Sequence, residues 1–215
     1  MDAMEQTAAR PRVLVIKLSS LGDLLHALPA VHALKAGLRA EIHWATQAAY
    51  AELAACFSEV ERVIPIHRRA WPRRLVEDIR ALRQSSYELV LDFQGLLKSA
   101  ALARLARGAS CIGPSFQREG ARLFYSAVAG PRNKQRHAVE ENLDIVRHLQ
   151  LPPAPVVFPL RFPRADLGAP WPRVALAPFS RWPSKNWPAA AFVEVGRELQ
   201  ERLKASLFLL GSPDE

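Results

Sequence analysis

The stretch RVLVIKLSSLGDLLHALP, Arg12–Pro29, decides the fold expected for this chain. It opens with an unbroken apolar run, Val13–Ile16, which is typical of a strand buried on both faces of a parallel sheet. A polar turn, Lys17–Asp23, follows, and from Leu24 onward apolar residues recur at helical spacing. The turn predicts a ligand site, because open α/β sheets bind their ligands at the carboxyl ends of their strands.

Asp23 is the candidate chemical centre of this turn. A helix that begins here directs unpaired N–H groups and the positive end of its dipole at a ligand. Two structural alternatives remain open. Ser20-Leu21-Gly22-Asp23 matches a capping box, in which the carboxylate only binds backbone donors, and Gly22 can simply permit a tight turn. The turn has neither a GxxxxGK[ST] nor a GxGxxG pattern, so it is not a generic nucleotide-binding motif.

The composition is apolar and basic. Of the 215 residues 49% are hydrophobic, and the net charge is +8, carried by 23 Arg and 6 Lys. Arginine matches carboxylate and phosphate oxygens, so this excess predicts an anionic partner, although nucleotide-composition bias in the source genome would inflate arginine equally. No apolar run is long enough for a membrane span, and the N-terminus lacks the apolar region of a secretory signal. Cys56 and Cys111 fit neither a disulfide framework nor a zinc site, which favours a reducing cytoplasm.

Strand and helix patterns alternate along the rest of the chain, which predicts an α/β fold. We expect strands at 41–46, 60–66, 89–93, 110–113, 174–177 and 206–210. The helix that Pro72 opens is expected to bury Leu75, Val76, Ile79 and Leu82. The many prolines of residues 151–173 predict a linker. The expected organisation is an N-terminal extension (1–11), a first domain (12–151), a Pro-rich linker (152–172) and the opening of a second domain (173–215).

Polar and basic side chains gather where predicted strands end. The third strand is followed by HRRAWPRR, residues 67–74, which favours an oxyanion-binding loop, with a solvated charged loop as the alternative. The fourth strand passes into a helix through Asp92 and Gln94. Lys98 lies about one turn into that helix, where the dipole disfavours a cation unless an anion binds nearby. A solvated surface lysine is an equal alternative.

Two residues of the following region are further candidates. Arg118 belongs to a segment, residues 116–136, that carries five Arg and Lys side chains against the single acid Glu119. His137 directly precedes a predicted helix and is either its cap or a ligand contact.

Four sequence blocks are similar to one known family. SSLGDLLHALP, LDFQGLLKSA, QRHAVEENL and the loop ending in SKNWP occur in the order and approximate spacing of the ADP-heptose:lipopolysaccharide heptosyltransferases, glycosyltransferase family 9. The resemblance spans residues 12–188. It implies a GT-B fold, of which this chain supplies an acceptor-binding Rossmann-like domain and the opening βαβ unit of a donor-binding domain. The chain most resembles the members that add the first heptose to Kdo-lipid A in the lipopolysaccharide inner core.

The resemblance also implies roles for individual residues. Asp23 matches the proposed catalytic base, and Lys185 matches the lysine of the donor-side loop. The implied catalytic residues are Asp23 and Lys185. The implied donor-binding residues are Ser20, Gly22, Ser180 and Lys185, and the implied acceptor-binding residues are Arg68, Arg69, Arg73, Arg74, Gln94, Lys98, Arg118 and His137.

The implied reaction is an inverting transfer from ADP-heptose to Kdo-lipid A, without a metal or other cofactor and without a nucleic-acid partner. It would take place at the cytoplasmic face of the Gram-negative inner membrane, with the enzyme bound peripherally. The loop FSRWPSK departs from the Thr-Thr pattern of these members, and the distal Asp-Thr-Gly-type donor motif has no counterpart. We therefore expect a truncated sequence that is inactive alone. The alternatives are a GT-B enzyme with another sugar acceptor or epimerase chemistry, and a non-catalytic basic module that binds anionic lipid.

Overall fold

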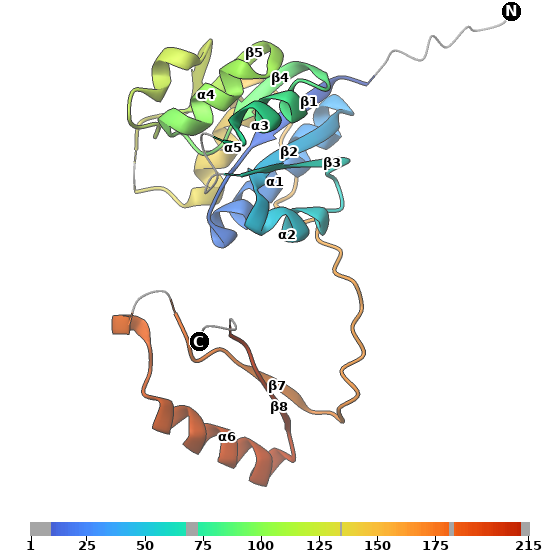
Figure 1. Cartoon of the computed structure of the whole chain (residues 1–215), viewed down its shortest axis with the longest axis vertical. Helices are drawn as coiled ribbons and strands as arrows, with labels where there is room; N and C mark the ends of the chain where they lie inside the picture. Colours follow the sequence, from blue (N-terminus) through green and yellow to red (C-terminus); the bar gives the residue numbers. More distant parts are fainter. Residues whose placement is uncertain (1–9, 68–72, 134, 181–182, 212–215) are drawn as a thin grey trace, which may run out of the picture. The chain divides into compact units, whose positions relative to one another are not determined.

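The computed structural model describes residues 10–67, 73–133, 135–180 and 183–211. The chain divides into two compact units, Met1–Pro163 and Arg164–Glu215, with the division inside the Pro-rich segment (Figure 1). The first unit contains a six-stranded sheet and the second a two-stranded sheet. Within the described residues, none of the helices combines the length and the apolar character needed to cross a bilayer.

The sheet of the first unit is parallel throughout and runs in the order β3-β2-β1-β4-β5-β6. The buried run Val13–Ile16 lies at its centre, paired with β2 and β4, which confirms the predicted strand and the α/β class. The chain order reverses between β1 and β4, and such a switch point opens a crevice at the carboxyl ends of the strands. The strands are β1 (Arg12–Ile16), β2 (Glu41–Gln47), β3 (Arg62–Ile66), β4 (Ser86–Asp92), β5 (Arg107–Pro114) and β6 (Ala127–Ala129).

Helices cover both faces of this sheet because side chains alternate along β1. Val13 and Val15 pack into one core with α1, α2 and α5, and Leu14 and Ile16 pack into a second core with α3 and α4. The four apolar residues Val13–Ile16 of β1 therefore serve two cores at once. The helices are α1 (Leu21–Leu38), η1 (Ala48–Tyr50), α2 (Ala51–Ala55), α3 (Leu75–Leu82), α4 (Leu97–Leu105), η3 (Ala121–Phe124) and α5 (Ala138–His148).

Two local expectations are wrong. Val76 is 56% exposed rather than buried, and Asp78 is buried instead, because its carboxylate accepts a hydrogen bond from the His67 backbone N–H at 3.0 Å. Lys98 is the second residue of α4 and lies in its first turn, not one turn further on. This helix ends at Leu105 and β5 begins at Arg107, where the absence of a Cβ at Gly108 leaves room for the Val90 side chain.

The second unit is the predicted strand–helix–strand element. β7 (Arg173–Leu176) and β8 (Ser206–Leu209) pair in parallel, and α6 (Ala189–Leu203) connects them after the short η4 (Pro183–Lys185). Gly196 lets α6 approach the sheet, since a Cβ there would meet the Leu207 side chain at 3.3 Å. The loop between β7 and α6 carries Ser180 and Lys185.

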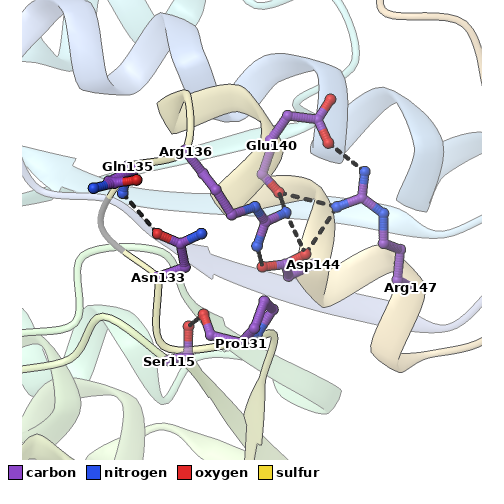
Figure 2. A network of polar contacts seen from close by, with 8 residues as sticks. All are labelled: Ser115, Pro131, Asn133, Gln135, Arg136, Glu140, Asp144 and Arg147. Atoms are coloured by element: carbon purple, nitrogen blue, oxygen red, sulfur yellow. Dashed lines mark hydrogen bonds and ion pairs between the residues drawn. The ribbon is translucent and has the colours of Figure 1, made fainter.

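An ion-pair network anchors α5 and the segment that leads into it (Figure 2). Both carboxylate oxygens of Asp144 accept hydrogen bonds from the Arg136 guanidinium, at 2.5 and 2.9 Å, and Asp144 Oδ1 also accepts from Arg147 at 2.8 Å. Glu140 forms an ion pair with Arg147. Gly130 lies directly against Asp144: its φ is +86°, and an added Cβ would lie 2.1 Å from Asp144 Oδ2. Only glycine fits at position 130 without disturbing the network.

Gly130→Ala should therefore destabilise the protein by about 3 kcal/mol, since the strain of a left-handed alanine adds to the displacement of the buried Asp144 carboxylate from its hydrogen-bond donors. Gly120→Ala is the matched control, because Gly120 has a φ of +77° and open space around its Cβ position. It should cost only about 1–2 kcal/mol from backbone strain. Urea unfolding followed by circular dichroism measures both variants, and equal losses would contradict the proposed contact.

Candidate active site

A pocket of about 370 Å³ opens at the carboxyl ends of β1 and β4, at the switch point of the sheet. The loops after β1, β4 and β5 and the first turns of α1 and α5 contribute its walls. The pocket is open enough and polar enough to receive a hydrophilic ligand. Its polar lining residues are Lys17, Asp23, His26, Gln94, Arg118, Glu141 and Asn142.

Asp23 both caps α1 and lines the pocket. Its Oδ2 accepts hydrogen bonds from the backbone N–H and the hydroxyl of Ser20, each at 2.8 Å. The capping-box contact that the sequence offers as an alternative is therefore formed. Burial alone would raise the pKa of Asp23, but the two hydrogen bonds from Ser20 and the charges of Lys17 and His26 outweigh it, so this pKa lies below the usual value. Asp23 therefore presents an ionised carboxylate to the pocket at neutral pH.

The tight-turn alternative for Gly22 finds no support. Gly22 lies outside the left-handed region, and a Cβ added to it would meet nothing within 4 Å. Neither the backbone conformation nor packing within the described residues requires glycine here, so the space beside it is available to a ligand.

Lys17 is a site residue that the sequence analysis missed. Its side chain is only 6% exposed, and its ammonium group donates a hydrogen bond to the Phe93 carbonyl oxygen at 2.7 Å. Burial lowers the pKa of Lys17, whereas the negative charges of Asp23, Asp92 and Glu141 oppose that effect. The available signal was a lysine directly after four apolar residues of a central strand, a position that faces the crevice of an open sheet.

Gln94 fixes the loop that carries Asp23. Its side-chain Oε1 accepts hydrogen bonds from the backbone N–H groups of Leu18 and Ser19, at 3.0 and 3.1 Å. Gln94 is one of the residues predicted to bind the sugar acceptor, and its side chain lines the pocket. Its carbonyl oxygen, however, is already engaged in hydrogen bonds within the protein. The Gln94 side chain thus joins the loops after β1 and β4, as the Lys17–Phe93 hydrogen bond also does.

Asp92 holds the turn of Gln94 and Gly95 through buried hydrogen bonds. Its fully buried carboxylate accepts hydrogen bonds from the backbone N–H groups of Gln94 and Gly95 and from the hydroxyls of Ser99 and Tyr125, all between 2.7 and 3.1 Å. Burial raises the pKa of Asp92 against the effect of these four hydrogen bonds. Burial and the adjacent Asp92 carboxylate also raise the pKa of the Tyr125 hydroxyl. The polar turn that faces the pocket therefore rests on a closed hydrogen-bond cluster.

Lys98 lines a different pocket from Asp23. This second pocket, of about 140 Å³, is bounded by apolar side chains such as Leu18, Ile66 and Leu102, with Lys98 and Glu119 among its polar groups. Gln94 and Leu96 line both pockets.

The other predicted acceptor contacts are dispersed. Arg118 is exposed and lines the Asp23 pocket. His137 caps α5, accepting a hydrogen bond from the Val139 N–H at 3.3 Å, and its ring meets the His26 ring edge-on at 5.4 Å. Arg73 and Arg74 are exposed just before α3, and Arg68 and Arg69 lie outside the described residues.

The predicted donor residues Ser180 and Lys185 belong to the second unit. The Asn186 side chain accepts a hydrogen bond from the Ser180 backbone N–H at 2.8 Å, which closes the loop, and Lys185 is exposed. Across the described residues, no three His, Cys, Asp or Glu side chains converge as a metal site.

A parallel sheet in this strand order, with a polar pocket at its switch point, defines a Rossmann-type ligand-binding domain. The model of a protein family, "Glycosyltransferase family 9 (heptosyltransferase)", matches residues 76–215. The chain therefore belongs to glycosyltransferase family 9.

Individual relatives agree with this assignment. The chain is 34% identical over 212 residues to lipopolysaccharide heptosyltransferase 1 of Pseudomonas aeruginosa, covering 89% of this chain and 58% of the relative. It is 39% identical over 148 residues to lipopolysaccharide heptosyltransferase 1 of Escherichia coli K12, covering 62% of this chain and 46% of the relative. The chain thus spans less than two thirds of the length of these curated relatives.

Solved structures are similar over nearly the whole chain. The E. coli heptosyltransferase WaaC with ADP matches with a TM-score of 0.79 and 30% identity, covering 94% of this chain and 69% of that one. The same enzyme with ADP-2-deoxy-2-fluoro heptose matches with a TM-score of 0.78, 30% identity and coverages of 94% and 70%. This likeness confirms the predicted GT-B type of fold for the part that it covers.

Replacing Gln94 by methionine should destabilise the protein by about 2 kcal/mol, because two partly buried N–H groups lose their acceptor. Gln94→Glu is the control of equal length that keeps an acceptor oxygen, and it should lie within about 1 kcal/mol of the wild type. Urea unfolding measures both. If the two variants lose the same stability, the bridge between the loops does not matter.

The pKa of Asp23 should rise toward its usual value in Ser20→Ala, which removes the hydroxyl donor, as measured by carbon-13 NMR titration of the carboxyl group. Because the folded-state pKa is lowered, Asp23 contributes stability that is present above its unfolded-state pKa and is lost as the pH falls through the folded-state pKa. The free energy of unfolding should therefore fall less between neutral and low pH in Ser20→Ala than in the wild type. An unchanged Asp23 titration would contradict the assigned cause.

Proposed function

We propose that this protein transfers L-glycero-D-manno-heptose from ADP-heptose to Kdo-lipid A in the synthesis of the lipopolysaccharide inner core. Membership of glycosyltransferase family 9 supports this, as do the relatives named lipopolysaccharide heptosyltransferase 1. The similar WaaC structures hold ADP and an ADP-heptose analogue. The observation that carries the proposal is the ionised Asp23 carboxylate in a pocket at the switch point, beside the buried Lys17.

In the proposed mechanism Asp23 is the general base. Ser20 occupies Oδ2 of Asp23, and among the described residues no hydrogen bond reaches Oδ1, which is left to accept the proton of the acceptor hydroxyl. The hydroxyl oxygen attacks the anomeric carbon of the heptose while the bond from that carbon to the diphosphate breaks, so the configuration inverts and ADP leaves. A carboxylate with a low pKa is a weak base, and it suffices when the proton moves late, after the attacking oxygen has become acidic.

The charge that develops on the departing diphosphate needs positive partners. The Ser20 N–H is taken by Asp23, but the N–H groups of Leu21 and Gly22 follow it at the start of α1, where the helix dipole favours an anion. In the second unit the exposed Lys185 and the Ser180 loop would contribute on the donor side. We assign acceptor binding to the first unit and donor binding to the second, in keeping with the order of the sequence motifs.

The acceptor is an anionic glycolipid, and the exposed cations of the first unit suit it. Arg118 at the Asp23 pocket, Lys98 at the adjoining pocket and the exposed Arg73 and Arg74 can bind carboxylates and phosphates. An acceptor with lipid chains would bring the enzyme to the cytoplasmic face of the inner membrane as a peripheral protein. Nucleic acid has no part in this reaction.

Asp23→Asn in the protein produced from its own gene should lower kcat by roughly 10²- to 10⁴-fold, because asparagine cannot take the proton. Asparagine still offers an oxygen to Ser20, so the helix cap and the thermal unfolding temperature should be nearly unchanged. Mass spectrometry of heptosylated Kdo-lipid A measures turnover, and Glu52→Gln, an exposed change on α2, is the control. Normal turnover in Asp23→Asn would refute the base, and no product from the wild type would refute the function.

A further inference from the structure

The Asp23 pocket contains a second carboxylate that the proposed mechanism does not use. Glu141, in the first turns of α5, is half-buried and lines the pocket. Among the described residues its side chain has no hydrogen-bond or ion-pair partner. Its neighbour Glu140 differs, because Glu140 forms an ion pair with Arg147 (Figure 2). Of these two adjacent glutamates, Glu140 forms an ion pair on its own helix, and Glu141 remains available to a ligand in the pocket.

The buried Lys17 allows two carboxylates to share this space. Its ammonium group interacts electrostatically with both Asp23 and Glu141, and within the described residues it donates one hydrogen bond, to the Phe93 carbonyl oxygen at 2.7 Å. An ammonium group has three donors, so Lys17 can still bind a ligand oxygen. With Arg118, the pocket thus offers two cations and two carboxylates rather than a uniformly basic surface.

Glu141 is also held in place. The Arg136–Asp144–Arg147 network fixes α5 (Figure 2), and the Asn142 side chain donates a hydrogen bond to the His26 carbonyl of α1 at 3.0 Å. His26 Nδ1, on the same wall, is shielded from solvent and has no hydrogen-bond partner among the described residues. A preorganised wall with unpaired polar groups is typical of a ligand-binding surface rather than of a structural one.

We propose that Glu141 is an acceptor-positioning residue, which accepts a hydrogen bond from a hydroxyl of the acceptor sugar next to the hydroxyl that Asp23 activates. An ionised carboxylate can only accept hydrogen bonds, so the ligand must donate them, and it repels a simple anion. Lys17 and Arg118 suit the acid group of the same ligand. The ligand class is therefore a polyhydroxylated sugar acid. This inference rests on the proposed function, since it names how that acceptor is recognised.

The test compares Glu141→Ala and Glu141→Gln with the matched control Glu140→Gln, in the protein produced from its own gene. Losing a hydrogen bond to a charged group should raise the KM for Kdo-lipid A by roughly 10- to 100-fold in Glu141→Ala, with kcat within about threefold. Glu141→Gln keeps an acceptor oxygen and should recover part of the loss. Glu140→Gln removes only an exposed ion pair and should leave KM unchanged.

A second readout separates this proposal from the proposed function. The dissociation constant of free Kdo, measured by ligand-observed NMR, should rise by a similar factor in Glu141→Ala and not in Glu140→Gln. If the wild type binds Kdo through Glu141 but transfers no heptose, the transferase function fails and the positioning role stands. Unchanged Kdo binding and unchanged KM in a folded Glu141→Ala would overturn the proposal, as would a loss confined to kcat.

Discussion

The hydrogen bond between the buried Lys17 ammonium and the Phe93 carbonyl is the contact on which the site depends. It joins the ends of β1 and β4 at the point where the sheet order reverses. A buried cation is tolerated only when negative groups surround it, and Asp23, Asp92 and Glu141 supply that charge. The lysine in turn lowers the electrostatic cost of three carboxylates near one crevice. Lys17 therefore couples the central strands of the fold to the charged groups of the site.

Asp23 joins a structural and a chemical role that the sequence motif presents as alternatives. Ser20 binds one carboxylate oxygen and so caps α1, while the same carboxylate lines the pocket. The cap orients the side chain and keeps it ionised, which is what the proposed transfer requires of its base. The turn after β1 gains its rigidity from Gln94 on the neighbouring loop.

Much of the fold could be predicted because its signals are local. Four consecutive apolar residues in β1 indicate a strand with two buried faces, and the elements after it alternate as expected. The misses arise from contacts that periodicity does not contain. Val76 is exposed and Asp78 is buried, because the Asp78 carboxylate binds the backbone N–H of His67, a residue of an earlier segment. β6 has only three residues, which are too few to show a strand pattern. Lys98 belongs to the helix after β4, as predicted, but it lies in the first turn of that helix and lines a separate pocket.

The amino-acid sequence alone indicates the α/β class, the turn that carries Asp23 and the motifs of the family, because each of these depends on residues that are close together in the chain. Only the tertiary structure decided which side chains share a pocket. Lys17 and Glu141 join Asp23 there because β1 is central and α5 packs beside α1. That arrangement depends on long-range strand order and helix packing, and the local pattern around Glu141 does not distinguish it from the surface residue Glu140.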